Sequence, residues 1–409
     1  MRLSLNKRTM SIYGFAIYLL GMHFGNTPSL MAFIVFAVLS FPQIKKMKLG
    51  MMAGSCLLLF LFSVISLVWV DRAYTNMGTV RILLVNLFQI FYLAVFISCY
   101  IRDKEDIIQM IKLIALTEAV YALYIILMTP LSYWGTSRFG RNIDTSKNNI
   151  SMQYAFAAVF LFFMLKNRLL GTKPYLWLML LFSAIALLSS SRKGLLILVL
   201  GVLMYYILSE RNYKLLRNIG ISIVAVVAVV LLLRRYNVFQ DLEQRMINML
   251  NNYSPFRNAE EGTDVSLTER AFYRREAIAL FAQHPILGAG IHGFTTYMRK
   301  INYSHVAYSH NNFTEMLADF GIIGFIIYYF PRFAVLVRLF KARKKSQWAL
   351  FGALVMLISL LNEYGFVSFY TSYMQIYYIL LFVISQKIVL LKDEPVPLRT
   401  SVKRKGVLA

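Results

Sequence analysis

The feature that most constrains this chain is a series of apolar runs, each near the length needed to cross a bilayer, that recurs from one end to the other. Hydrophobic residues make up 58% of the 409 residues and charged residues only 15%. Backbone polar groups in lipid must be satisfied within the segment, so such runs predict an all-α fold, a polytopic membrane bundle of about 12 transmembrane helices. The spans are expected at 11–24, 28–43, 50–70, 78–100, 106–128, 150–166, 174–190, 194–209, 217–233, 312–331, 347–364 and 369–391.

The net charge of +24 follows from where Lys and Arg stand between the runs. Basic clusters follow alternate spans, as at 45–48 and 338–345, whereas the loops 25–27 and 364–368 carry no Lys or Arg. The positive-inside rule therefore predicts a multi-pass protein of the cytoplasmic membrane with both termini in the cytoplasm and the segment 234–311 outside. Because the basic residues serve topology, they do not indicate nucleic acid as a partner.

The chain is expected to form a single transmembrane domain over 1–391, with an extracytoplasmic insertion at 234–311 that contains short helices. The polar tail 392–409 is expected to be cytoplasmic and disordered. Within the insertion, Ser266 and Glu269 fit a capping box, and Pro285 stops the helix that they start. This helix is predicted to lie along the outer membrane surface.

Several basic residues lie on the outer side, where topology gives no reason for them: Arg192, Lys193, Arg270 and Arg274. An anionic ligand supplies a reason, and a phosphate or pyrophosphate matches the guanidinium fork best. The alternative is an interfacial helix whose arginines reach the lipid headgroups, without any ligand.

Polar residues concentrate at 266–324, which holds most of the candidates for chemistry. His310 lies where the outer segment enters a membrane helix, and a neutral imidazole there can accept a proton from a hydroxyl. The alternative is a helix cap without a catalytic role. A metal held by His305 and His310 is a weaker alternative, because no further ligand motif accompanies them. The glycine turn at 288–293 can cradle a phosphate but does not meet the dinucleotide fingerprint.

These residues resemble a known pattern. The segments Arg270…His284-Pro285-Ile286-Leu287-Gly288-Ala289-Gly290, Ser309-His310-Asn311-Asn312 and Gly321-Ile322-Ile323-Gly324 resemble the O-antigen ligase/O-antigen polymerase superfamily of bacterial membrane proteins. The turn Ser189-Ser190-Ser191-Arg192-Lys193-Gly194 is similar to the Ser-Arg-Gly motif of that family. The chain departs from the pattern at Lys193, which separates Arg192 from the glycine, and at Arg274, where the family often has an aromatic residue.

The resemblance implies a GT-C-like, metal-independent, inverting glycosyltransferase that needs no cofactor. Its donor is expected to be an undecaprenyl-diphosphate-linked glycan, and its other partners the lipid bilayer, a flippase and a chain-length regulator. The resemblance makes His310 the catalytic base. It assigns the pyrophosphate to Arg192, Arg270 and Arg274, with Asn311, Asn312, Glu315 and Lys193 in supporting positions.

The favoured function is a polymerase that joins lipid-linked repeat units into O-antigen, capsular or exopolysaccharide chains at the outer face of the membrane. A high content of Lys, Tyr, Asn and Ile favours it, because this is typical of AT-rich genomes, many of which carry capsule or exopolysaccharide clusters. The alternative is a ligase that moves the finished glycan to lipid A-core or another acceptor. A transporter or flippase is less favoured, because it predicts charges within several spans, and here Glu118 and Glu363 are the main ones.

Overall fold

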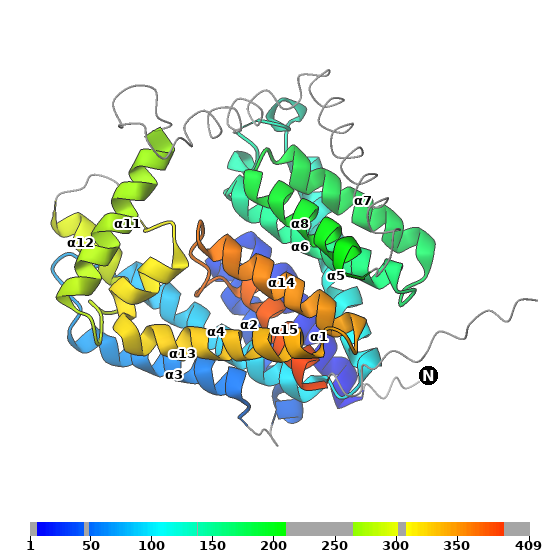
Figure 1. Ribbon diagram of the computed structural model, residues 1–409, viewed down its shortest axis with the longest axis horizontal. Helices are drawn as coiled ribbons and strands as arrows, with labels where there is room; N and C mark the ends of the chain where they lie inside the picture. The colour runs from blue at the N-terminus through cyan, green and yellow to red at the C-terminus, as the bar shows by residue number, and fades with distance from the viewer. Residues whose placement is uncertain (1–5, 45–48, 137, 210–264, 302–307, 388–409) are drawn as a thin grey trace, which may run out of the picture.

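The computed structural model of the protein describes residues 6–44, 49–136, 138–209, 265–301 and 308–387 (Figure 1). Within these ranges all regular secondary structure is helical. The predicted span at 217–233, the 234–264 part of the outer insertion, His305 and the tail 392–409 lie outside the described residues.

Each predicted span within the described ranges coincides with a helix, so the sequence-based helix assignments are confirmed there. Short 3₁₀ helices join some of them, namely η1 (Met22–Phe24), η2 (Ser66–Val68), η3 (Leu131–Tyr133) and η4 (Arg141–Ile143). The α-helices are α1 (Lys7–Gly21), α2 (Asn26–Ile44), α3 (Met51–Ile65), α4 (Met77–Tyr100), α5 (Lys104–Met128), α6 (Lys147–Lys166), α7 (Thr172–Leu188), α8 (Arg192–Ser209), α11 (Val265–Gln283), α12 (Gly293–Lys300), α13 (Asn312–Ala342), α14 (Gln347–Glu363) and α15 (Ser372–Lys387).

Six stretches of the described chain are long and apolar enough to cross a membrane: α2, α3 with η2, α4, α5, α6 and α13. The helix α6 lies at the centre of the bundle, since 78% of its apolar window is buried, against 22% for the peripheral α2. The total of twelve spans and the GT-C-like arrangement stay predictions.

Contacts between helix ends form two groups, one at each end of the bundle. These groups agree with the alternation of basic and non-basic loops along the sequence. At the end predicted to be cytoplasmic, Arg8 of α1 forms an ion pair with Asp106 of α5. At the same end, the amide of Asn167 donates to the hydroxyl of Tyr205 at 3.0 Å and so joins the ends of α6 and α8. The outer helices α11 and α12 lie at the opposite end, where α13 begins (Figure 1). Which of the two groups faces the cytoplasm stays a prediction.

A buried polar network joins the last three helices within the bundle. Glu363 at the end of α14 accepts hydrogen bonds from the hydroxyls of Tyr328 at 3.0 Å, Tyr329 at 2.8 Å and Tyr378 at 2.8 Å. The guanidinium of Arg332 lies 3.4 Å from the ring centroid of Tyr328, which places a positive charge beside this group. The Glu363 carboxyl group therefore ties α13, α14 and α15 together.

Candidate functional site

The membrane helix α13 is broken near its outer end. Gly321 has φ of 61° and ψ of −163°, a conformation that residues with a Cβ rarely adopt. Such a break frees backbone groups that must find partners in an apolar environment. The loop before α12 supplies them, because the N–H groups of Ala289 and Gly290 donate to the carbonyls of Ala318 and Asp319 at 2.9 and 2.8 Å.

The loop and α13 donate hydrogen bonds to each other in both directions. The N–H of Ile322, just beyond the break, donates to the carbonyl of Pro285 at 2.9 Å. A Cβ on Gly321 would overlap the carbonyl oxygen of Ile286, so only glycine fits the contact. The N–H groups at 288–291 all have protein acceptors. The glycine turn at this place therefore docks on α13, and its N–H groups are not directed at a phosphate.

Asp319, about two turns inside α13, caps the short helix α12. Its Oδ1 accepts a hydrogen bond from the N–H of Phe294 at 2.7 Å, and the backbone of His292 and Gly293 also interacts with the carboxyl group. The first N–H groups of a helix lack acceptors within the helix, so this contact stabilises α12 against α13. Asp319 thus holds α12 in place against α13.

The start of α13 fixes the position of His310. Asn311 is the N-cap of the helix, and its side chain accepts from the N–H of Phe313 at 2.9 Å. Glu315 accepts from the N–H of Ser309 at 2.6 Å. His310 stands between these contacts with φ of 56°, which is uncommon for a residue other than glycine. Two of the predicted supporting residues therefore hold the backbone on either side of the predicted base.

Asn312 ties the loop between α14 and α15 to the same place. Its Oδ1 accepts from the N–H groups of Ser368 at 2.8 Å and Phe369 at 3.1 Å. The ammonium group of Lys193 donates to the carbonyl of Gly365 in this loop. The loop thus connects the start of α13 with the start of α8.

Small side chains bring the start of α8 close to α6. A Cβ on Gly194 would overlap Ser151 of α6, so glycine allows the two helices to approach closely. The hydroxyl of Ser191 donates to Asn148 at the start of α6 at 2.8 Å. These contacts place Arg192 at the outer end of the bundle.

The structure brings the predicted cations together around the predicted base. The positive charges of Arg270, Lys193 and Arg274 all act on His310. The charges of Arg270 and Arg192 act in turn on Lys193. Residues of α8, α11 and the start of α13, far apart in the sequence, therefore form one cationic cluster. Like charges repel, and an anion bound among them relieves that repulsion.

Aromatic rings, which the sequence reading did not single out, enclose His310. Its ring centroid lies 3.9 Å from that of Tyr308 and 6.0 Å from that of Tyr273. Burial, together with the charges of Arg270, Lys193 and Arg274, lowers the pKa of His310 to about 4. The imidazole is therefore neutral at pH 7 and able to accept a proton. Tyr273 gives a weak sequence signal, since it falls on the Arg270 face of α11 by helical spacing.

Arg270 carries an unsatisfied donor. Its Nε is buried and has no hydrogen-bond partner within the described part of the chain. Leaving such a group unpaired costs about 1–3 kcal/mol, more for a charged one. Arg275 on the same helix is different, because its side chain is 74% exposed and lies 3.4 Å from Glu276. The unpaired, buried Nε of Arg270 fits a place where an anion binds.

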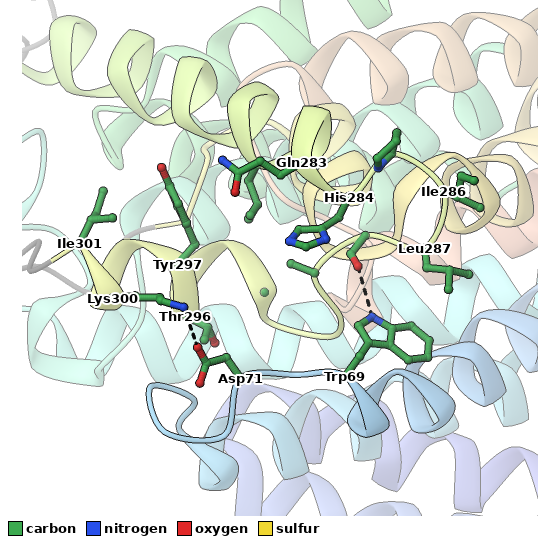
Figure 2. Close-up of a pocket in the computed structure, with 15 residues that line it drawn as sticks. Trp69, Asp71, Gln283, His284, Ile286, Leu287, Thr296, Tyr297, Lys300 and Ile301 are labelled. Carbon is green, nitrogen blue, oxygen red and sulfur yellow. Dashed lines mark hydrogen bonds and ion pairs between the residues drawn. The ribbon is translucent and has the colours of Figure 1, made fainter.

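A separate cavity lies near the cationic cluster, and none of the residues of the cluster lines it. It has a volume of about 800 Å³ and lies between the segment after η2 and the 284–289 loop beneath α11. Figure 2 shows Trp69 on one side, with its indole N–H bonded to the Gly288 carbonyl at 3.2 Å, and His284 on the other. Lys300 pairs with Asp71 at 3.1 Å at its edge. Neither His310 nor the cationic cluster lines this mostly apolar cavity.

Metal ligands do not gather among the described residues: no three His, Cys, Asp or Glu side chains in those ranges are placed to share an ion. His305, the partner considered for His310 in a metal site, lies outside them. Metal independence therefore stays a prediction.

Comparison with known families agrees with the motifs. Residues 177–329 match the family model described as O-antigen ligase. The match contains Arg192, Arg270 and His310, and therefore the segments that build the cationic cluster. None of the curated proteins matches the chain. Residues 177–329 are thus similar to the O-antigen ligase family, which supports the predicted O-antigen ligase/O-antigen polymerase superfamily.

Proposed function

We propose that the protein is a polymerase that joins undecaprenyl-diphosphate-linked oligosaccharide units into O-antigen, capsular or exopolysaccharide chains at the outer face of the cytoplasmic membrane. One observation carries the proposal. A neutral histidine, His310, stands beside a half-buried arginine, Arg270, whose buried Nε lacks a partner among the described residues. This pairing suits a reaction between a hydroxyl group and a sugar that leaves a diphosphate.

The cationic cluster supports the role of donor site. Arg192, Arg270 and Arg274 present guanidinium groups, which bind phosphate oxygens in a bidentate manner. As the bond between the sugar C1 and the diphosphate oxygen breaks, negative charge grows on the leaving group. Preorganised cations stabilise that charge more in the transition state than in the ground state, which accelerates the reaction.

His310 would act on the other reactant. It takes the proton from a hydroxyl of the acceptor sugar, and the oxygen forms a bond to C1 of the donor. Attack from the face opposite the diphosphate inverts C1. The electron pair of the broken bond leaves with the lipid diphosphate, and the proton stays on His310. Atoms and charges balance without a cofactor.

Donor binding and base strength are coupled in this scheme. Two of the cations that lower the pKa of His310, Arg270 and Arg274, are also assigned to the diphosphate. A bound diphosphate neutralises them, so the pKa rises from about 4 towards its ordinary value. The histidine therefore becomes a stronger base when the donor is bound. This favours removal of the acceptor proton at the time when the donor is in place.

The test is His310→Ala in the full-length chain, scored by polymer made from lipid-linked repeat units. Loss of a general base is expected to lower the rate by about 100-fold or more. The matched control is His284→Ala, an exposed histidine in the neighbouring cavity, which is expected to keep activity. Full-length polymer from the His310→Ala protein would remove His310 as the base.

A second test concerns the cations. Arg192→Lys keeps the charge but loses the planar fork, and a bidentate diphosphate contact predicts a raised KM for the donor. Unchanged kinetics would show that Arg192 makes no such contact.

The second candidate is a ligase, which the description of the matching family model favours. The length of the lipid-linked glycan in a deletion strain separates the two candidates. Single repeat units on undecaprenyl diphosphate indicate a lost polymerase. Full chains stranded on the same carrier indicate a lost ligase.

A further inference from the structure

A second polar hollow lies near the catalytic end but takes no part in the steps above. It has a volume of about 340 Å³, within the range of small-molecule sites. The turn η1, the end of α5, the start of α6 and the start of α15 enclose it. Its lining includes His23, Tyr121, Tyr124, Asn149, Gln153 and Tyr373.

A buried carboxylate lies behind this hollow. Glu118 of α5 is 5% exposed, and the amide of Gln153 donates to its two oxygens at 2.8 and 2.7 Å. The same amide nitrogen lies 3.2 Å from Nδ1 of His23, and Nε2 of His23 lies 3.8 Å from the carboxylate. An ionisable group in an apolar span is costly, and it normally marks a functional site. The cationic cluster does not include this carboxylate.

Aromatic rings form one wall of the hollow. The rings of His23 and Tyr121 stack with centroids 4.0 Å apart, and Tyr124 stacks on Tyr121 at 6.0 Å. Phe24 meets the Tyr124 ring edge-on at 5.1 Å. Tyrosine presents an apolar face together with a polar tip. A pyranose has the matching form, with an apolar C–H face and a rim of hydroxyl groups.

Tyr373 connects the hollow to the catalytic histidine. Its hydroxyl is buried and has no hydrogen-bond partner among the residues that the structure describes. Its side chain interacts electrostatically with both Glu118 and Tyr308. The ring of Tyr308 in turn lies 3.9 Å from that of His310. Tyr373 therefore lines the hollow, interacts with both Glu118 and Tyr308, and carries an unsatisfied hydroxyl.

We propose that this hollow binds a sugar residue of the acceptor glycan, and that Tyr373 donates a hydrogen bond to one of its oxygens. The inference rests on the proposed function, because it supplies the acceptor side of the same reaction. The cations of α8 and α11 hold the donor, whereas η1, α5, α6 and α15 hold the acceptor. Sugar hydroxyls then satisfy the Tyr373 donor while the tyrosine wall covers the apolar face of the ring.

The experiment uses the full-length protein in lipid nanodiscs. The probe is the repeat-unit oligosaccharide released from its lipid carrier by mild acid, which serves as a soluble acceptor. Binding is measured by saturation-transfer NMR, and transfer from the lipid-linked donor by initial rates. Tyr373→Phe removes only the hydroxyl, and Asn149→Ala removes a second lining group. Tyr175→Phe is the matched control, since Tyr175 lines a hollow at the opposite end of the bundle.

Loss of one hydrogen bond is expected to raise the Kd and the acceptor KM of Tyr373→Phe about threefold to tenfold, with the donor KM unchanged. Asn149→Ala is expected to act in the same direction, and Tyr175→Phe to match the wild type. Equal acceptor binding by all variants, or no binding by the wild type, overturns the inference. If the oligosaccharide binds in a Tyr373-dependent manner but is never extended, the acceptor hollow stands and the polymerase proposal fails.

Discussion

The break in α13 makes a quantitative prediction for Gly321→Ala. The alanine must adopt a backbone conformation that side chains disfavour, and its Cβ must displace the loop that fills the break. These two effects can be measured separately, because other glycines of the chain show one or neither of them.

Backbone strain is measured at Gly25. This residue has φ of 94° and ψ of −176°, similar to Gly321, but no atom lies within 4 Å of an added Cβ. Gly25→Ala is therefore expected to lower the free energy of unfolding by about 1–3 kcal/mol, from strain alone. Gly54 lies inside α3 and also has free space, so Gly54→Ala carries neither cost. It is expected to be neutral or stabilising by about 0.5–1 kcal/mol.

The clash adds to the strain at Gly321. To relieve the overlap with Ile286, the loop must withdraw from the break. The hydrogen bonds that Ile322 and Ile323 donate to loop carbonyls, at 2.9 and 3.3 Å, are then lost. At about 0.5–1.5 kcal/mol for each bond, the total for Gly321→Ala becomes about 2–6 kcal/mol.

The assay is unfolding by sodium dodecyl sulfate in mixed micelles, followed by circular dichroism, with all three variants compared in one preparation. The order expected for the loss of stability is Gly321→Ala, then Gly25→Ala, then Gly54→Ala. If Gly321→Ala loses no more than Gly25→Ala, the loop does not stabilise the break, and the reasoning fails.

Three further predictions concern the catalytic end. Arg270→Gln is expected to raise the pKa of His310 above about 4, seen by NMR titration of labelled histidine, whereas Arg275→Gln leaves it unchanged. Because the pKa of His310 in the folded state lies below the ordinary 6.5, the wild type loses stability as the pH falls from 6.5 to about 4. Arg270→Gln is expected to lose less stability over this range. Equal dependence of stability on pH in the two proteins would contradict the contact. Asn312→Ala leaves two N–H groups of the α14–α15 loop unpaired, at about 1–3 kcal/mol each; wild-type stability in the same unfolding assay would show that the loop is held by other contacts. Asp319→Ala removes the side-chain acceptor at the start of α12, and faster hydrogen exchange in α12 is expected; unchanged exchange would rule out the capping role.

The helices and the sorting of their ends could be predicted from the sequence because both depend on local rules. A span needs a run of apolar residues of bilayer length, and the cationic residues between runs report their side. The ion pair of Arg8 with Asp106 and the junction of Arg192 with the outer segments both follow that alternation.

The break in α13 could not be predicted in the same way. The run at 312–331 is apolar throughout apart from a few polar residues near its start, and glycine is common in membrane helices. What decides the conformation of Gly321 is a loop more than one helix away in the sequence. Asp319 is similar, because it caps a helix that it does not belong to, and no spacing rule relates it to Phe294.

The charged residues of the site could be predicted from the sequence, but the aromatic residues that surround them could not. Arg192, Arg270 and His310 stand out because charge or imidazole on the outer side needs a reason. The Tyr308 ring beside His310 and the hollow at Glu118 carry no such signal, because aromatic residues are frequent throughout the chain, at 15%. Their positions depend on which helix ends meet in three dimensions.

The docking of the 284–290 loop on α13 also has a consequence for biogenesis. The acceptors Pro285 and Ile286 leave the ribosome before Ile322 and Ile323, so the partners of the broken helix exist before the helix enters the membrane. Until the loop docks, the break exposes unsatisfied backbone groups, and the segment that carries His310 has no fixed support. The backbone around His310 therefore gains its support only after the loop has docked on α13.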